Sequence, residues 1–486
     1  MHHMASHAGA NRLPAAARHA DAGHGGHVAP PRPSPAEATT ELVRATAAGR
    51  RFKLAALILT VLAVLGVVGI IARLAGGTGP ADQKEWGYVA ATMAFMLVAF
   101  GGAPLVAIAP TLAKANWNRP LTRVAALFSM AGVVTALLLI PLLAVLPPLV
   151  VDGARRRSVW FDGPTYSPHF WGMIALSGLA LTGLGLFYAN ALPDFAAVRD
   201  HATGWRQRLG KRLANGFAGT DNQWRSLRMR IGMLGTLYFL LLVFTHFLIS
   251  TDFAISLVPG WKDAIFPMYQ SLTSLQAGIA STLIAMWAAR RFGGLEKYIQ
   301  RDQFWALGKL MFGMSLLWFY FFFSGFIVFW YGRSGPDTMV LDLLVRGPFI
   351  YAFIAAFVLS FFLPWWLLIW NKLRDSVWGP PLVAVLILTG NFLNEVRVYV
   401  TSWSVDPAHI HDRFLSPETV NTVGTHFPDI FDIFVIVGAP AAGVLLMLLA
   451  SRAVPVVSIW EVKQWLLLSR PMKYMKGHVV LVAKPD

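Results

Sequence analysis

Long apolar segments recur along the chain between residues 54 and 451, and short polar loops separate them. Each segment is close to or longer than the roughly 20 residues that an α-helix needs to span the hydrocarbon core of a bilayer. Because lipid offers the backbone no hydrogen-bond partner, helix is the expected state, whereas barrel strands would be shorter and alternating. Internal residues such as Pro104 are tolerated as kinks. The pattern predicts about ten transmembrane helices, at residues 54–74, 88–113, 124–150, 169–192, 231–250, 264–289, 305–331, 346–370, 381–402 and 430–451.

Composition indicates the same class, an all-α integral membrane protein. Hydrophobic residues make up 56% of the 486 residues and charged residues only 14%, whereas soluble domains carry about 25% charged residues. The 18 Trp and 33 Phe suit aromatic belts at the two membrane interfaces. The chain has no cysteine, so any Cys-ligated iron–sulfur cluster must belong to a partner protein.

The two ends of the chain differ from the apolar middle. Residues 1–50 are rich in Ala, Gly, His and Pro and have few large apolar side chains, which predicts a disordered tail. This tail is too long and too polar for a simple signal peptide. We therefore expect a disordered cytoplasmic tail at 1–50, a polytopic domain at 51–455 and a cytoplasmic C-terminal segment at 456–486.

Lys and Arg concentrate in alternate loops, which predicts cytoplasmic N- and C-termini by the positive-inside rule. The triplet Arg155–Arg157 argues against this orientation, although Asp152 and Asp162 partly offset it. The net charge of +16 fits orientation signals and anionic lipid better than nucleic acid, which is not expected as a partner. The cytoplasmic set comprises Lys114, Arg119, Arg123, Arg199, Arg206, Arg208, Lys211, Arg212, Arg225, Arg228, Arg230, Arg290, Arg291, Lys297, Arg301, Lys372 and Arg374.

In this orientation, four predicted helices bring polar and titratable groups to one level in the outer half of the membrane. Burying such groups costs about 2.5–3.5 kcal/mol each, so they serve either a function or bonds between helices. Glu395 and Arg397 are two residues apart and do not face each other on a helix; His246 is a candidate partner for Glu395. The set comprises His246, Asp252, Tyr269, Gln270, Asn391, Asn394, Glu395, Arg397, Asp429 and Asp432.

The stretch THFLISTDFAISLVPGWKDAIFPMYQ, from Thr245 to Gln270, resembles the NrfD/PsrC-like family of respiratory membrane subunits. The likeness is strongest to the quinone-binding membrane subunits of alternative complex III. WNRPLTR (117–123) and ALPDFAAVRD (191–200) are similar to loops of that family. FLNEVRVYVTS, FPDIFDIFVIVG and RAVPVVSIWEVK resemble its last two helices, so the likeness covers about residues 50–465 in order.

The resemblance implies two four-helix bundles with flanking helices and a quinol pocket near the outer face. In that family pattern His246 or Tyr269 would hold a quinone oxygen, and Asp252 or Glu395 would accept a proton. Trp261 would close the pocket, and Gln270, Asn394 and Arg397 would contribute to binding. A proton path through Asp432, Asn190 and Asp194 is a further hypothesis.

The resemblance also implies a setting, a bacterial cytoplasmic membrane. The cofactor would be menaquinone or ubiquinone. The partners would be an iron–sulfur subunit, cytochrome c subunits and a second subunit of the NrfD kind, together forming a quinol:electron-acceptor oxidoreductase. Haem is not expected in this chain, because among its histidines only His246 lies well within a predicted span.

Some positions depart from the family pattern. Lys262 stands where a histidine or another polar residue is more usual, and no acidic residue lies near Ala125. Two other functions therefore stay open. A secondary transporter would place its polar groups near the midplane of broken helices, often in inverted repeats, and a structural anchor would have no quinone site.

Overall fold

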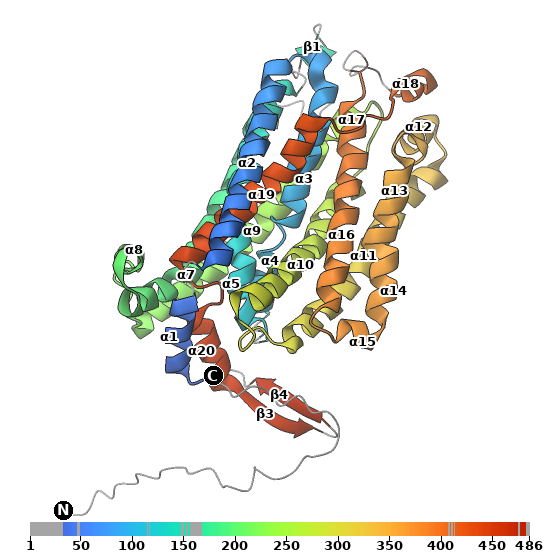
Figure 1. The fold of residues 1–486 in the computed structure, drawn as a ribbon. Helices are drawn as coiled ribbons and strands as arrows, with labels where there is room; N and C mark the ends of the chain where they lie inside the picture. The colour runs from blue at the N-terminus through green and yellow to red at the C-terminus, as the bar shows by residue number, and fades with distance from the viewer. Residues whose placement is uncertain are drawn as a thin grey trace, which may run out of the picture. The chain divides into compact units, whose positions relative to one another are not determined.

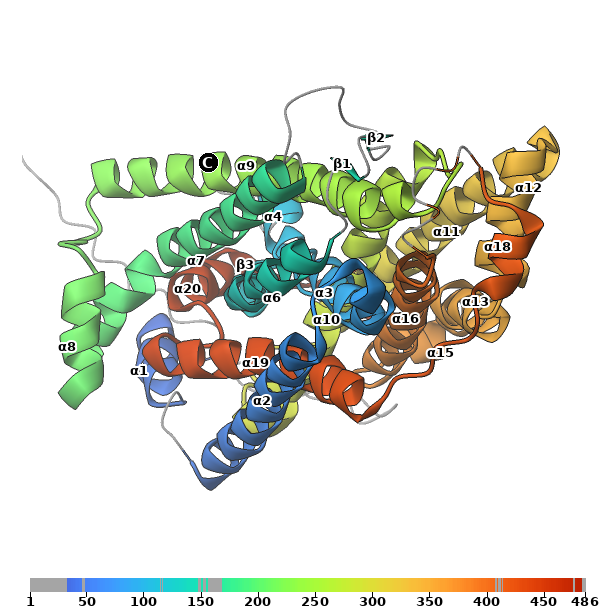
Figure 2. The same ribbon diagram turned by 90° about the horizontal axis from the view of Figure 1, so that it is seen from above.

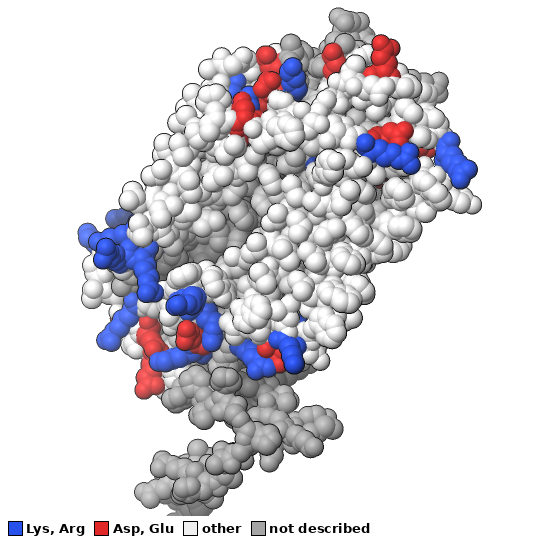
Figure 3. All heavy atoms as spheres, turned by 45° about the vertical axis from the view of Figure 1, so that its right-hand side comes forward, with Lys and Arg blue, Asp and Glu red and all other residues white. Residues whose placement is uncertain are grey.

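Nine helices in the described part of the chain are long and apolar enough to cross a membrane. The computed structural model describes residues 33–45, 49–113, 115, 117–146, 150–151, 154–155, 168–406, 409, 412, 414–474 and 477–482. On the face drawn in Figure 3, charged side chains gather at the two ends and leave a broad band without charges between them. The prediction of an all-α integral membrane protein is confirmed.

The candidate spans follow the predicted apolar segments closely (Figure 1). Several are built from consecutive helical pieces, including short π-helical or 3-10 turns labelled η. In chain order they contain α2 (Arg50–Gly76), α5 (Thr122–Leu127) with η4 (Phe128–Met130) and α6 (Ala131–Val145), α7 (Met173–His201), α9 (Asp221–Phe253), α10 (Ile265–Gly293), α11 (Arg301–Gly332), α13 (Ile350–Phe357) with η8 (Val358–Phe362) and α14 (Leu363–Ile369), α16 (Gly379–Glu395) with η9 (Val396–Val400) and α17 (Thr401–Trp403), and α19 (Ile430–Ala453).

The predicted span at 88–113 is not one continuous helix, and this expectation was wrong. It divides into α3 (Gly87–Ala99) and α4 (Leu105–Leu112). At this break the backbone of α10 is in direct contact with the chain: a Cβ on Gly102 would lie 1.9 Å from the backbone oxygen of Ser274. Side chains replace the lost helical bonds: Ser274 Oγ donates to the Val98 carbonyl at 3.0 Å, and the Tyr238 hydroxyl donates to the Gly101 carbonyl at 2.8 Å.

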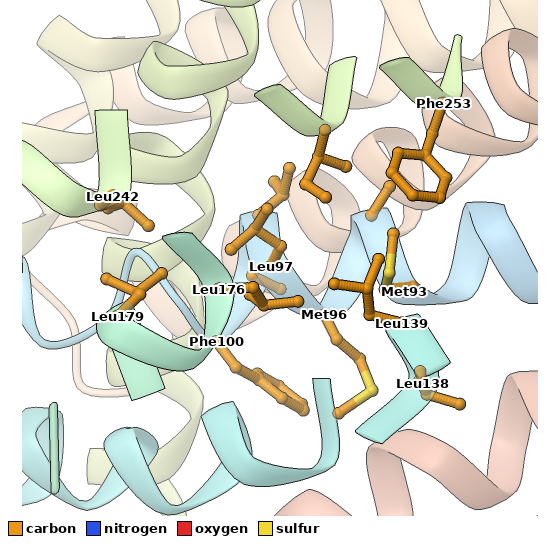
Figure 4. Close-up of a cluster of buried hydrophobic side chains, with 14 of the residues drawn as sticks. Met93, Met96, Leu97, Phe100, Leu138, Leu139, Leu176, Leu179, Leu242 and Phe253 are labelled. Carbon is orange, nitrogen blue, oxygen red and sulfur yellow. The ribbon is translucent and has the colours of Figure 1, made fainter. Parts of the chain in front are cut away.

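The membrane helices pack as two groups of four with two flanking helices. The first group contains α3–α4, α5–α6, α7 and α9, and the second contains α10, α11, α13–α14 and α16. Helix α3 also packs against α10, α16 and η9 of the second group. Figure 2 shows the fold from above, with α3 and α10 near the centre, α7 and α9 on one side and α11, α13 and α16 on the other. Leu, Met and Phe side chains from α3, α6, α7 and α9 fill the core of the first group (Figure 4).

Helices α2 and α19 form a closely packed pair beside the first group. A Cβ on Gly438 of α19 would lie 2.4 Å from the Cα of Gly66 on α2, so the two backbones are in direct contact. Small residues allow such close approach between helices in lipid, where van der Waals packing and interhelical hydrogen bonds drive association.

A helix lies within the predicted disordered tail, so that prediction was wrong for residues 35–45. Helix α1 (Pro35–Ala45) buries Ala38, Leu42 and Val43. It packs against α20 (Ile459–Leu468), and Lys297 forms a 2.7 Å ion pair with Glu41. The few apolar residues of α1 are stabilised by tertiary contacts, which the overall composition of the tail does not reveal. Residues 1–32 lie outside the described residues.

Two short antiparallel hairpins complete the described structure. Strands β1 (Val150–Val151) and β2 (Ala154–Arg155) form one hairpin in the loop before α7. Arg155, the first residue of the arginine triplet, lies in β2 opposite Val150. Strands β3 (Ser469–Tyr474) and β4 (Gly477–Val482) form the other, after α20, with Ser469 opposite Val482.

We predict that Gly438→Ala destabilises the protein by about 1–3 kcal/mol, because the added methyl group overpacks the contact with Gly66. The measurement is thermal unfolding of the full chain in mild detergent. Gly313→Ala on α11 is the matched control, since a Cβ there meets nothing within 4 Å. Equal effects of the two substitutions would contradict the close packing of α2 and α19.

Candidate functional site

A pocket opens in the second helix group between α10, α11, α13 and η9, beside α12 (Gly335–Leu341) and η7 (Asp342–Arg346). The volume of its cavity is about 80 Å³, and its mouth is open. Most of its wall is apolar and aromatic, formed by Phe266, Phe321, Phe322, Phe326, Phe329, Phe353, Val340, Leu341 and Leu344.

A few polar residues face this apolar pocket: Trp261, Asp263, Tyr269 and Arg397. Tyr269 is buried, and its hydroxyl makes no hydrogen bond to any described residue. Sequence analysis predicted Trp261, Tyr269 and Arg397 as binding residues, and the structure brings these three together. It adds Asp263, whose Oδ1 accepts hydrogen bonds from the amides of Ile265 and Phe266 at 2.8 and 2.9 Å.

Arg397 is held in place by acceptors on one side of its guanidinium group. Nη1 donates to the Leu344 carbonyl at 2.8 Å and Nη2 donates to Asn394 Oδ1 at 2.9 Å. The guanidinium carbon lies 5.4 Å from the centre of the Phe353 ring, which is within the range of cation–π attraction. Its Nε has no hydrogen-bond partner among the described residues. Asn394 thus positions Arg397 and does not line the pocket.

Glu395 lies next to this arrangement and is fully buried. Gln270 Nε2 on α10 donates to Glu395 Oε2 at 2.8 Å, while Oε1 accepts no hydrogen bond from the described residues. The expectation that Glu395 needs a partner on another helix is confirmed, but that partner is Gln270, and the pairing suggested with His246 was wrong. The π-helical turn η9 begins directly after Glu395, and π turns are frequent at functional sites.

A second set of buried hydrogen bonds joins α10 to its neighbours from Gln276, six residues after Gln270. Gln276 Nε2 donates to Ser315 Oγ at 3.0 Å and to the Ser360 carbonyl at 2.9 Å, and Ser360 Oγ donates to Asn391 Oδ1 at 3.0 Å. All four residues are buried. They join α10, α11, η8 and α16 but do not line the pocket. Only Asn391 among them was singled out from the sequence.

His246 and Asp252 lie on α9, in the other helix group, and neither lines the pocket. Both are buried. His246 Nε2 has no hydrogen-bond partner within the described part of the chain. The Asp252 backbone carbonyl accepts a hydrogen bond from Ser256 Oγ at 2.9 Å. Their proposed roles in quinone chemistry rest on the family resemblance.

Asp432 belongs to an ion cluster that joins α2 and α19. Arg73 Nη2 lies 2.8 Å from both Asp429 Oδ1 and Asp432 Oδ2, and Nη1 lies 2.8 Å from Glu85 Oε2. Asp429 and Asp432 also cap the first turn of α19. The cluster gives Asp432 a structural role, and its place in a proton path stays a prediction.

Asn190 and Asp194 lie in a second buried cluster, where α7 meets α20. Arg123 Nη2 donates to the Asn190 carbonyl at 2.8 Å and pairs with Asp194 Oδ2 at 2.9 Å, and both charged side chains are fully buried. Asp194 Oδ1 accepts from the backbone amides of Ile459 and Trp460 at 3.1 and 3.3 Å. A carboxylate at these free amides stabilises the start of α20.

Glu461 on α20 extends this cluster, and sequence analysis did not single it out. Its side chain is buried close to Arg123, Arg119 and Asp194. Burial raises the pKa of Glu461 to about 8, although the positive charge of Arg123 opposes the shift. The sequence around Glu461 shows no apolar pattern that would predict the burial of this side chain.

Comparison with known protein families and with functionally characterised proteins finds no match to this chain. Among the described residues, no group of three His, Asp or Glu side chains lies close enough together to hold a metal ion. The functional interpretation therefore depends on the geometry of the pocket and on the sequence resemblance.

We predict that Glu461→Gln removes a pH-dependent loss of stability. A folded-state pKa of about 8 against 4.5 in the unfolded chain makes wild-type stability fall as pH rises through this interval. The variant should match the wild type at pH 4.5 and exceed its unfolding temperature at pH 8. Thermal unfolding across this range, with exposed Glu296→Gln as control, measures the effect. Parallel pH profiles for wild type and Glu461→Gln would contradict it.

Proposed function

We propose that the chain is a membrane subunit of a respiratory redox complex and that it binds quinol or quinone in the pocket between α10, α11, α13 and η9. The observation that carries this proposal is the combination found there. An apolar aromatic wall meets a few polar groups with free hydrogen-bonding capacity. The buried carboxyl of Glu395 does not line the pocket but interacts electrostatically with Tyr269 and Arg397, which do.

The pocket suits the two parts of a quinone. A flat, apolar ring and its isoprenoid chain would pack against the phenylalanine side chains of α11 and α13, where aromatic contacts favour offset or edge-on stacking. The ring oxygens need hydrogen-bond donors, and the Tyr269 hydroxyl and Arg397 Nε are buried donors without a partner in the described chain. A ligand that accepts these hydrogen bonds relieves their cost of burial.

Glu395 is suited to accept a proton from bound quinol. Oxidation of a quinol releases two electrons and two protons, so the reaction needs a base within reach directly or through one water. The Oε1 atom of Glu395 has free acceptor capacity among the described residues, and the Gln270 amide holds Oε2.

The electrons must leave through another protein, because this chain has no cysteine to ligate an iron–sulfur cluster. We propose an iron–sulfur subunit at the outer face as the acceptor, with cytochrome c subunits and a second NrfD-like subunit in the same complex. The positive-inside pattern favours cytoplasmic N- and C-termini, and the resemblance favours a bacterial cytoplasmic membrane and menaquinone or ubiquinone as the substrate.

The broken helix α3–α4 is the feature that would favour a secondary transporter, since such proteins bind ions at helix breaks. Here, however, the carbonyls of Val98 and Gly101 already accept hydrogen bonds from Ser274 and Tyr238. Gly102 and Gly278 bring the backbones at the break into contact. A purely structural anchor would have no use for an aromatic pocket lined by Tyr269 and Arg397.

We predict that Glu395→Gln lowers quinol oxidation by the purified native complex by about 10²-fold or more, the usual contribution of a positioned general base. The apparent KM for quinol should change little, because the amide keeps the shape of the carboxyl. Asp252→Asn is the comparison, and it should retain most of the activity. Loss of activity in Asp252→Asn with an active Glu395→Gln would assign the proton acceptor to α9 instead.

We predict that Tyr269→Phe weakens binding of a quinone analogue by about five- to tenfold, the usual effect of one lost hydrogen bond. Titration of the purified complex with the analogue, followed by a competitive binding assay, measures this change. Tyr331→Phe is the matched control because Tyr331 is 79% exposed and lies outside the pocket. Unchanged affinity in Tyr269→Phe would remove this residue from the site.

A further inference from the structure

Helix α8 (Gly204–Leu213), between α7 and α9, is held firmly against the rest of the protein. Arg206 donates from Nη1 to the Val43 carbonyl of α1 at 2.9 Å and from Nε to the Arg452 carbonyl of α19 at 3.2 Å. A Cβ on Gly210 would lie 2.7 Å from the Arg199 amide of α7, so the two backbones touch. The face of α8 that carries Arg206 and Gly210 is therefore used for packing.

The opposite face of α8 carries basic side chains and a tryptophan toward solvent. Trp205, Arg208 and Arg212 follow one another at spacings of three and four residues and so share one side of the helix. All three are exposed, as is Lys211 beside them. Asp221 is the sole acidic residue of the sequence between residues 201 and 251, so this face has little opposing charge of its own.

The surroundings of α8 combine its basic face with exposed apolar surface. The helix lies at the side of the helix group, at the ends of α7 and α9 (Figures 1 and 2). The following part of α9 carries exposed apolar side chains: Met229, Met233 and Leu237 are 60%, 66% and 45% exposed. Exposed Arg225, Arg228 and Arg230 lie just before or among them on the same helix.

We propose that the exposed face of α8 is a binding site for the phosphate headgroup of an anionic phospholipid at the membrane surface. Arginine guanidinium groups match phosphate oxygens with paired hydrogen bonds. A tryptophan at the end of such a helix settles at the level of the headgroups. Several cations on a rigid surface then attract an anionic lipid additively. This site is separate from the proposed quinone pocket and does not depend on it.

Native mass spectrometry of the full chain in mild detergent tests the proposal, with phosphatidylglycerol and phosphatidylcholine as the probes. The wild type should bind phosphatidylglycerol at least about tenfold more tightly than phosphatidylcholine, as expected for more than one added cation–anion contact. The double variant Arg208→Gln/Arg212→Gln should lose this preference. The control Arg291→Gln/Lys372→Gln removes two exposed cations elsewhere and should keep it.

A competition arm separates a lipid site from a site for soluble phosphate. A large excess of inorganic phosphate should leave phosphatidylglycerol bound, because the acyl chains also contact the apolar surface next to α8. Displacement by inorganic phosphate would overturn the assignment to lipid. Thermal unfolding checks that the wild type and the α8 double variant are both folded. If the two then bind phosphatidylglycerol equally, the site itself is overturned.

Discussion

The close contact of α10 with the break between α3 and α4 joins the two halves of the membrane domain. Gly102 and Gly278 bring the backbones together, and Ser274 donates to the Val98 carbonyl across the contact. In hydrocarbon, a break in a helix is tolerated where other groups satisfy its carbonyls. Any larger side chain at either glycine would separate α10 from the first helix group, so this contact determines which side of α10 faces the second.

The orientation of α10 has consequences for the candidate site. With Ser274 and Gly278 directed to the break, Gln270 and Gln276 meet buried polar groups on α11, η8 and α16. Tyr269 then lines the pocket beside Arg397. The Glu395 carboxyl, the Arg397 guanidinium group and the Tyr269 phenol come close enough to interact electrostatically where α10 packs against α16. The atoms that protein groups leave without a hydrogen bond are those that a ligand could use.

Much of the fold could be predicted from the sequence, since length and apolarity alone define a membrane span. Pro104 indicated a kink, but the full break at Phe100–Pro104 could not be predicted, because it depends on the approach of Ser274 and Gly278 from a distant part of the chain. Helix α1 was missed for a similar reason, as its few apolar residues gain stability from α20. Tertiary contacts determine both features.

The candidate site was predicted in part. Depth along the membrane follows from sequence position, and it selected Tyr269, Gln270, Glu395 and Arg397 correctly as neighbours. Sequence position does not determine which neighbouring helix a side chain faces. His246 was therefore predicted as the partner of Glu395, whereas the structure pairs Glu395 with Gln270. The phenylalanine wall of α11 and Asp263 were also missed, because aromatic residues are abundant in many spans and a loop carboxylate resembles a helix cap.

The most direct test of the central claim is photoaffinity labelling of the native complex with an azido-quinone, followed by identification of the labelled peptides. The account predicts that labelling falls on the pocket-lining residues of α11 and α13, between Phe321 and Phe329 and around Phe353, and that excess quinone suppresses it. Labelling confined to α9 near His246, or labelling that excess quinone does not reduce, would contradict a quinone site in this pocket.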